Sequence, residues 1–477
     1  MRWLATGKPG IRVALGAAAC AAVAFISPEV AWTDEAPACE PVVSAGQSDT
    51  KLLHAGKLLT VPGRKPQETQ TIVVRGGEIV EVIAGYRCPQ DLGLEAAAVF
   101  DLSRRFVLPG LIDSHVHITS TPSPTFLLDR VTMSDAHRAI WGAANARDTL
   151  LAGFTTVRNL AAFRGDSFDA DFALRDGIEA GKVPGPRILA AGQGIGSTAS
   201  QGDFLGYRYE VMDLFAPRST CSGAAACREA VRYQVKRGAD FIKMVATGWA
   251  TGPAQAGDQQ HMFPDEMEAV VATARLFGRK VTAHATGVEG VKAALRAGVD
   301  SIEHGMVLDD EAIALFRESG AYLVPTLLVT ERFIAQEEGA MAAEEGGRVP
   351  GSARPAEAGE AQSLRAVAER MYDSHRRAHR AGVRFAFGTD SAITPHGDNA
   401  REFAMLVERV GMTPMEAIVT ATVNAADHIG LSDTLGTLEP GKAADLIAVD
   451  GDPLRDVTEL ERVSFVMRAG RVYRHER

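Results

Sequence analysis

The residues best able to do chemistry lie in Asp113-Ser-His115-Val-His117, directly after the apolar run 106–112. If this run is a strand, His115 and His117 point to the same face, because strand side chains alternate. Two imidazoles that converge at a strand end make half of a zinc-type site. The pattern is weak alone, since two polar residues often end a strand without binding anything.

Further residues of types that bind metals follow in separate apolar runs, each near the end of an expected strand: Lys243, His284, His304 and Asp390. Taken singly, each histidine is better explained as a core histidine with satisfied hydrogen bonds, and the lysine as a salt-bridged core residue. Five strand ends that supply metal-binding groups in one chain are hard to produce by chance. The set therefore predicts a metal centre.

Lys243 lies inside the apolar run Phe241-Ile-Lys-Met-Val245. An unpaired ammonium is costly in a buried strand, and apolar neighbours lower the lysine pKa and favour the free amine. A free amine can add carbon dioxide to become a carbamate, whose two oxygens can bridge two metal ions. We therefore expect two divalent ions, with zinc as the default for nitrogen and oxygen ligands and manganese or iron as alternatives.

The expected ligands divide between the two ions. One ion takes His115, His117, the Lys243 carbamate and Asp390, and the other takes the carbamate, His284 and His304 and keeps an open position. A hydroxide that bridges the ions is the expected nucleophile, because metal binding brings the pKa of water to about 7. Asp390 is the expected catalytic proton shuttle, and His304 and His284 are the next candidates for this role.

These residues need a scaffold that brings strand ends together, and the middle of the chain alternates strand and helix signals. The expected strands are 107–112, 155–159, 187–191, 241–246, 280–283, 301–302, 322–328 and 384–387. The expected helices are 134–152, 170–180, 224–237, 264–277, 287–297, 309–319 and 362–381. Strands and helices in this alternation predict an α/β fold, the (β/α)8 TIM barrel, whose active site lies at the carboxyl ends of its strands.

Both ends of the chain are rich in short β-prone runs. Residues 51–107 and 437–477 are expected to form one small β-sandwich from both termini, with Gly76-Gly77 as a hairpin turn, and residues 108–436 to form the barrel. Residues 336–360 are rich in Gly, Ala, Glu and Pro, which predicts an insertion after the seventh strand. We expect a solvated loop there, with a lid over the barrel mouth as the alternative.

The N-terminus predicts export. Arg2, Lys8 and Arg12 precede the apolar run 13–26, a pattern typical of a secretory signal peptide over residues 1–33 with an uncertain cleavage site. An uncleaved membrane anchor is the alternative, for which the run is short.

The cysteine count agrees with export. Without Cys20 the chain keeps Cys39, Cys88, Cys221 and Cys227, an even number that suggests disulfides in a periplasmic or secreted protein. Cys221 and Cys227 could pair across their short loop, which would leave Cys39 for Cys88.

Charge and length exclude some partners. The 477 residues carry a net charge of −10 with both signs interspersed, so the basic stripe typical of nucleic-acid binding is missing. After the predicted signal peptide, no run approaches the ~18 apolar residues that suggest a membrane span.

The chain resembles the amidohydrolase superfamily in the motifs 108–117, Glu303-His-Gly305, Gly388-Thr-Asp390 and 438–447. It is most similar to imidazolonepropionase-like proteins with a lysine on strand four, a branch that includes Xaa-Pro dipeptidases and ochratoxin amidohydrolases. The resemblance implies a binuclear site with a carboxylated lysine, usually zinc, and many such relatives assemble into homo-oligomers.

The resemblance also suggests substrate-binding residues. Ser120 falls where ochratoxin-hydrolysing relatives carry a serine. Gln201 and Thr286 occupy positions associated with substrate recognition, where many dipeptidase relatives carry His and Tyr. His261, in the loop between strands four and five, either lines the pocket or is a solvated loop histidine.

We expect an exported metallohydrolase that cleaves an amide bond in a small dipeptide or N-acyl amino acid, a class that includes ochratoxin A. A cyclic-amide hydrolase or deaminase of the same superfamily is the first alternative, and the signal peptide and Lys243 argue against it. A non-catalytic scaffold barrel is the second alternative. It predicts the loss of at least one ligand, whereas all six are present.

Overall fold

The computed structural model describes Cys39 and residues 48–94, 96–123, 125–161, 169–248, 259–344 and 358–476. The predicted signal peptide, residues 1–33, lies outside this part of the chain, so export stays a prediction.

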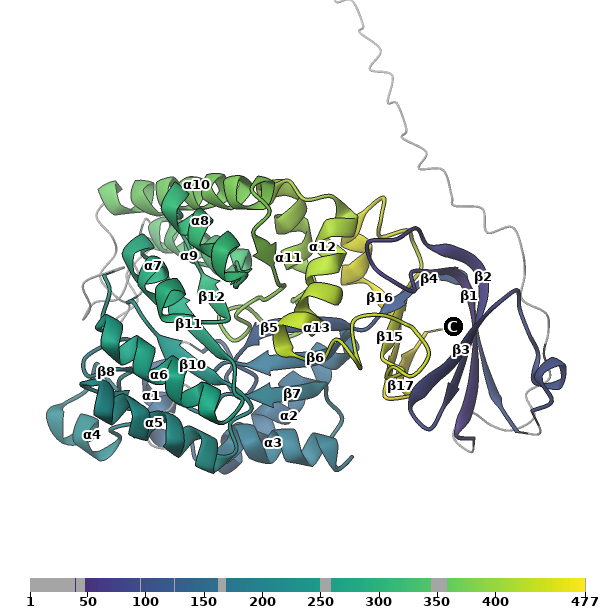
Figure 1. The fold of residues 1–477 in the computed structure, drawn as a ribbon, viewed down its shortest axis with the longest axis horizontal. Coiled ribbons are helices and arrows are strands. Elements are labelled where there is room, and N and C mark those ends of the chain that lie inside the picture. The colour runs from purple at the N-terminus through teal and green to yellow at the C-terminus, as the bar shows by residue number, and fades with distance from the viewer. Residues whose placement is uncertain are drawn as a thin grey trace, which may run out of the picture. The chain divides into compact units, whose positions relative to one another are not determined.

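The central element is a barrel of parallel strands surrounded by helices (Figure 1), which confirms the predicted fold class. Its strands are β5 (Leu111–Val116), β6 (Phe154–Asn159), β7 (Arg187–Ala190), β8 (Ile195–Ser197), β9 (Thr220–Cys221), β10 (Ile242–Val245), β11 (Val281–Ala285), β12 (Ser301–His304), β13 (Tyr322–Val324) and β14 (Arg384–Phe385). They pair in the orders β5-β6-β7 and β14-β13-β12-β11-β10-β8-β9. Backbone bonds join the two groups, from His117 N to Ser391 O and from Asp240 N to Ala190 O.

Two predicted strands differ from the observed ones by more than two residues at an end. The run 107–112 is split: Val107 to Pro109 belongs to the small sheet, and β5 begins at Leu111. The break falls at Gly110, where a Cβ would lie 2.3 Å from Thr155 Oγ1, so the chain passes too close for any other residue. As a result His115 lies inside β5, and only His117 follows its end.

The seventh strand was also predicted too long. It ends at Val324 and not at Leu328, because helix α9 begins at Leu327. The buried Glu402 carboxylate accepts the backbone N–H groups of Leu327 and Leu328, at 2.7 and 2.8 Å, which satisfies two of the donors that a helix start leaves unpaired.

The helices are α1 (Phe126–Thr132), α2 (Asp135–Leu151), α3 (Asp169–Glu179), α4 (Tyr209–Leu214), α5 (Ala224–Arg237), α6 (Pro264–Leu276), α7 (Val288–Ala297), α8 (Asp310–Ser319), α9 (Leu327–Glu344), α10 (Ala358–Arg380), α11 (Arg401–Met405), α12 (Pro414–Thr420) and α13 (Val423–Ile429). Helix α5 has the predicted bounds. The loop predicted at 336–360 was wrong where α9 and α10 extend into it, and residues 345–357 lie outside the described part.

Both termini contribute strands to one small domain, as predicted, and the strands of the expected sandwich form a single continuous sheet. Its strands are β1 (Thr50–Leu58), β2 (Gln67–Arg75), β3 (Glu78–Ala84), β4 (Ala98–Pro109), β15 (Leu446–Val449), β16 (Val463–Arg468) and β17 (Arg471–His475), in the order β17-β16-β15-β4-β1-β2-β3. The β2–β3 turn uses Gly76 and Gly77 at φ +58° and +89°. Ala444 N donates to Gly77 O and Gly470 N to Ala444 O. These bonds join the β2–β3 turn to the β16–β17 end, and the curled sheet encloses an apolar core.

The structure contains the two disulfides that were predicted. The sulfur atoms of Cys39 and Cys88 are bonded at 2.06 Å, and those of Cys221 and Cys227 at 2.09 Å.

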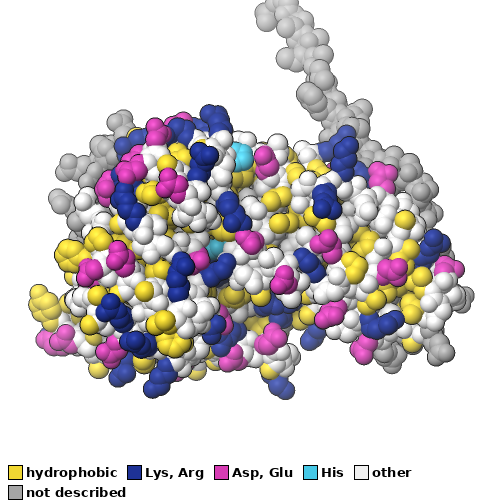
Figure 2. Space-filling model, viewed as in Figure 1, with side chains coloured by type: hydrophobic (Ala, Val, Ile, Leu, Met, Phe, Trp, Pro, Cys, Tyr) yellow, Lys and Arg dark blue, Asp and Glu magenta, His cyan; other side chains and the backbone are white. Residues whose placement is uncertain are grey.

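On the face shown in Figure 2, Lys and Arg side chains are interspersed with Asp and Glu. Within the described residues we find no helix of the length and apolarity needed to cross a membrane.

Candidate metal centre

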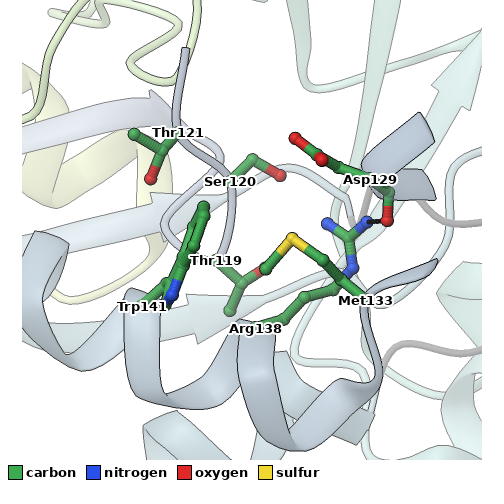
Figure 3. Close-up of a pocket in the computed structure, with 7 residues that line it drawn as sticks. All are labelled: Thr119, Ser120, Thr121, Asp129, Met133, Arg138 and Trp141. Carbon is green, nitrogen blue, oxygen red and sulfur yellow. Dashed lines mark hydrogen bonds between the residues drawn. The ribbon is translucent and has the colours of Figure 1, made fainter. Parts of the chain in front are cut away.

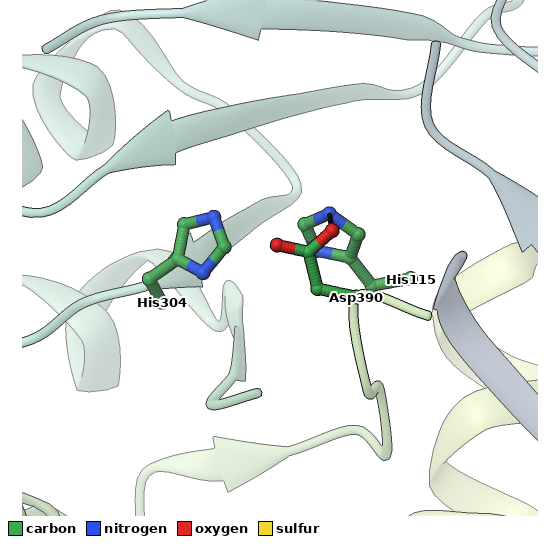
Figure 4. A group of neighbouring side chains, drawn as sticks. All are labelled: His115, His304 and Asp390. Carbon is green, nitrogen blue, oxygen red and sulfur yellow. Dashed lines mark ion pairs between the residues drawn. The ribbon is translucent and has the colours of Figure 1, made fainter. Parts of the chain in front are cut away.

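Three predicted ligands from distant parts of the chain meet inside the barrel. His115 from β5, His304 from the end of β12 and Asp390 from the loop after β14 are all buried, and each contributes an atom to a group that lies within 4.8 Å. Nε2 of His115 is 3.4 Å from Oδ1 of Asp390. In Figure 4 the Asp390 carboxylate overlaps the His115 ring and directs one oxygen toward His304.

The other three predicted ligands surround this group. Nε2 of His117 is 3.1 Å from Asp390 Oδ1. The ring of His284, on β11, is centred 4.6 Å from the ring of His304. Lys243, the second residue of β10, interacts electrostatically with Asp390 and with the histidines of the group. The fold thus brings five of the predicted ligands into contact, and Lys243 is near enough to interact electrostatically with four of them.

The histidines are oriented through their Nδ1 atoms. Nδ1 of His115 is 2.8 Å from Glu303 Oε2, Nδ1 of His117 is 2.8 Å from Ala161 O, and Nδ1 of His304 is 2.7 Å from Thr326 Oγ1. An Nδ1 that donates a hydrogen leaves the lone pair of the ring on Nε2. For His115 and His117, Nε2 is the atom that faces Asp390.

Burial and neighbouring charges set the protonation states of these groups. It lowers the pKa of His115, brings that of His284 to about 3 and holds that of His304 well below the usual value, so the imidazoles are neutral near pH 7. Burial also lowers the pKa of Lys243 to about 8. For Asp390, burial acts to raise the pKa, but the adjacent histidines outweigh it and lower this pKa below its usual value.

Left-handed backbone at two ligands helps to form the centre. His304 has φ +73° and Asp390 has φ +55°, values that are uncommon for residues other than glycine and that cluster at functional sites. Glu303 and His304 are consecutive in β12, and yet both lie against His115. The left-handed turn at His304 interrupts the strand alternation that would otherwise send them to opposite faces.

Sequence reasoning missed a buried network behind β5. Asp113 Oδ1 accepts the backbone N–H of His115, at 3.0 Å, while Oδ2 accepts Thr389 Oγ1 at 2.6 Å and Asn399 Nδ2 at 2.7 Å. This carboxylate ties the strand of His115 to the loop of Asp390. The sequence did place Asp113 within the 108–117 motif, but no local pattern indicated that it bonds to Thr389 and Asn399.

A second missed network lies beside β12. The Glu303 carboxylate accepts from His115 and, at 2.6 Å, from Nη2 of Arg158 on β6. Burial acts to raise the pKa of Glu303, but Arg158 and His115 outweigh it and hold this pKa well below the usual value. A charged residue on each of two buried strands was the signal that could have pointed to this pair.

The residues present fit the predicted ions. Neutral imidazoles and a carboxylate are ligands that zinc prefers, and their atoms converge on one space inside the barrel. Lys243, on β10, is near enough to act on the pKa values of His115, His284 and His304.

The four predicted substrate-binding residues are in different environments. Ser120 is buried, and among the described residues its hydroxyl has no hydrogen-bond partner. Thr286 is buried, and its hydroxyl donates to Gly248 O at 2.8 Å. His261 is half-buried and bonded through its backbone to Ala246. Gln201 is exposed on the loop after β8.

Ser120 lines a small pocket next to the ligand loop (Figure 3). Thr119, Ser120 and Thr121 follow His117 after Ile118. The wall is completed by Asp129 of α1, Met133 between the two helices, and Arg138 and Trp141 of α2. The pocket therefore combines an aromatic ring and a thioether with two charged side chains. The structure brings Ser120 to this pocket, and neither Gln201 nor His261 nor Thr286 lines it.

Comparisons with known proteins agree with this geometry. Residues 106–473 match the amidohydrolase family model. The chain is 30% identical to an ochratoxinase of Aspergillus niger over 458 residues, which cover 91% of this chain and 89% of the relative. It is 30% identical over 196 residues to an imidazolonepropionase of Sphingopyxis alaskensis, covering 40% of each chain.

Solved structures give the same result. A Xaa-Pro dipeptidase with bound methionine superposes with a TM-score of 0.76 at 35% identity and covers 89% of this chain and 100% of its own. The A. niger ochratoxinase structure superposes with a TM-score of 0.76 at 27% identity, and the match covers 90% of this chain and 96% of the ochratoxinase chain. From the match across the barrel and these relatives, we conclude that the chain belongs to the amidohydrolase family, as a hydrolase acting on C–N bonds.

Proposed function

We propose that this chain is an exported enzyme with two divalent ions, zinc by first choice, that hydrolyses the peptide-type amide bond of dipeptides or N-acyl amino acids, ochratoxin A included. The observation that carries this proposal is the convergence of His115, His304 and Asp390 within 4.8 Å, with His117 beside them. The dipeptidase and the ochratoxinase among its relatives support the choice of substrate.

We assign each of these residues a role in metal binding or in proton transfer. Zinc held by the cluster would supply Lewis-acid activation of water and of the amide carbonyl. Asp390 would accept a proton from the attacking water and return it to the departing amine, since its carboxylate is buried within the group and ionised. Lys243 would react as the free amine with carbon dioxide, losing one proton, and present two carbamate oxygens to the ions.

The pocket beside Ser120 is too small to enclose a substrate, but the side chains that line it offer a substrate both apolar and charged contacts. Trp141 and Met133 offer an apolar surface, and the guanidinium of Arg138 offers a site for a carboxylate. An N-acyl amino acid carries both kinds of group.

The test begins with metal analysis of the mature protein, where we expect about two zinc ions per chain. The zinc-loaded enzyme is then assayed against dipeptides, N-acyl amino acids including ochratoxin A, and cyclic ureides, and we expect release of the free amino acid from the first two classes. Chelated enzyme, before and after zinc is restored, is the control. One ion per chain together with an unmodified Lys243 would overturn the binuclear site.

Turnover of cyclic ureides alone would instead favour the cyclic-amide alternative, which the imidazolonepropionase relatives support. Export is tested separately by N-terminal sequencing of protein taken from the periplasm or the medium. Assembly into homo-oligomers, expected from the family, is tested by light scattering.

A further inference from the structure

Glu303 is a buried carboxylate that is not among the proposed ligands. It precedes His304 on β12, its side chain is 0% exposed, and its Oε2 lies 2.8 Å from Nδ1 of His115 on β5. A carboxylate without compensation is strongly disfavoured in such a place. Its contacts therefore have to account for its presence.

The two oxygens of Glu303 have different partners. Oε1 accepts from Nη2 of Arg158 at 2.6 Å, from Ser301 Oγ at 3.0 Å and from Thr282 Oγ1. Arg158 is itself held by a bond of 2.7 Å from its Nε to Ser114 O. Oε1 thus receives the charge compensation, whereas among the described residues Oε2 contacts His115.

We propose that Glu303, held by Arg158, is a positioning residue that sets the tautomer and the orientation of His115 for metal binding. A carboxylate can only accept, so the His115 nitrogen that faces it, Nδ1, must carry the hydrogen. The lone pair is then on Nε2, which lies 3.4 Å from Asp390 Oδ1 and faces the proposed ions. An anionic acceptor on Nδ1 also makes the imidazole a stronger ligand. This inference rests on the metal centre proposed above.

The competing explanation is that Glu303 serves only as the counter-ion of Arg158 in the barrel interior. The two explanations differ in what happens when both charges are removed. If Glu303 is only a counter-ion, the variant Glu303→Gln/Arg158→Met should bind metal like the wild type. If Glu303 acts through His115, removing Arg158 as well restores the charge balance, but Nδ1 then faces a neutral amide, which is no longer an anionic acceptor and can turn its NH2 group toward the ring.

We would compare Glu303→Gln, Arg158→Met and the double variant by competition for Zn²⁺ against a chromophoric chelator. We expect the double variant to unfold near the wild-type temperature as apoprotein and to bind one zinc ion 10–100-fold more weakly. Arg158→Met alone should keep the higher affinity, because Glu303 still faces His115. Wild-type zinc affinity in the double variant would overturn the proposal.

Glu266→Gln is the matched control. Glu266 is also buried, but within the described part of the chain its carboxylate accepts from the backbone N–H groups of Gly223 and Phe263, at 2.6 and 2.8 Å. The control measures the general cost of neutralising a buried glutamate, and its zinc affinity should not change.

A second measurement does not depend on activity or on any variant folding. Neutron diffraction or ¹⁵N-histidine NMR of the zinc-loaded wild type should show the hydrogen of His115 on Nδ1; the zinc-loaded form is needed because Asp390 Oδ1 offers Nε2 a second acceptor in the metal-free protein. A hydrogen on Nε2 instead would refute the proposal. A wild type that binds zinc but cleaves none of the amides would refute the proposed function alone, since the positioning effect would still be measured as zinc affinity.

Discussion

Asp390 has two proposed roles, as a metal ligand and as a base, and a single substitution can separate them. Asp390→Asn keeps the size and one oxygen of the side chain but removes its basicity. We expect the variant to retain much of its zinc and to lose kcat by roughly 10²–10⁴-fold, the usual contribution of a general base. Zinc content and kcat are measured on the same sample. Near-normal turnover with zinc retained would assign proton transfer elsewhere, with His304 and His284 as the next candidates.

Lys243 is tested through the carbamate. Lys243→Ala removes the two proposed bridging oxygens, so we expect zinc and activity to be lost together. Short-chain carboxylic acids should restore part of both, because a free carboxylate can occupy the space left by the side chain and supply two oxygens. Zinc content and turnover are followed against acetate concentration. Full activity without any added acid would exclude a bridging role.

At the scale of elements, the site depends on how closely β5 approaches the segment after β14. A Cβ built on Gly388 would lie 2.4 Å from Val324 Cγ1, 2.9 Å from His115 Cβ and 3.2 Å from His115 N. Gly388→Ala should therefore push His115 away from Asp390, weaken zinc binding and lower stability by about 1–3 kcal/mol.

Gly177→Ala is the matched control for Gly388→Ala. Gly177 lies within α3, and a Cβ there would only touch Val183 Cγ2 at 3.8 Å. Since alanine is the better helix former, this variant should be as stable as the wild type or more stable. Zinc titration and thermal unfolding of both variants test the pair. Equal zinc affinities would show that the approach of β5 is not critical.

The start of α9 predicts a pH dependence of stability. Burial raises the pKa of Glu402 from 4.5 to about 8, against the opposing effect of the N–H groups of Leu327 and Leu328. Because the folded state holds this proton more tightly than the unfolded chain, the contribution of Glu402 to stability is full below about pH 4.5 and is lost as the pH rises to about 8. Glu402→Gln cannot titrate, so the difference in unfolding free energy between wild type and variant should change across this range. Urea titrations from pH 4 to 9 measure it, and a constant difference would contradict the prediction.

At the scale of the whole molecule, the two disulfides and the predicted signal peptide make one joint prediction. Cys221–Cys227 joins β9 to α5, and Cys39–Cys88 joins a residue before the first strand to the segment after β3. Both should form in an exported protein, because the periplasm and the medium are oxidising. Non-reducing peptide mapping of protein from its native compartment should recover both linked peptides. Four free thiols would count against the bridges and against export.

The sequence by itself was enough to predict the barrel, the small sheet built from both termini and the residues that the fold gathers at the centre. These features depend on local pattern. Strand and helix periodicities are visible within a few residues, and a parallel barrel brings the carboxyl ends of its strands to one rim whatever their separation in the chain. His115 and Asp390 could therefore be placed together without knowledge of any side-chain contact.

Only the tertiary structure decided which side chains support the ligands. Glu303 reaches His115 across 188 positions of sequence, and Asn399 reaches Asp113 across 286. It also decided that the chain breaks at Gly110 and that the backbone at His304 turns left-handed. The physical reason is the same in each case: these features depend on the atoms that another strand places within a few ångströms, and the local sequence carries no record of that neighbour.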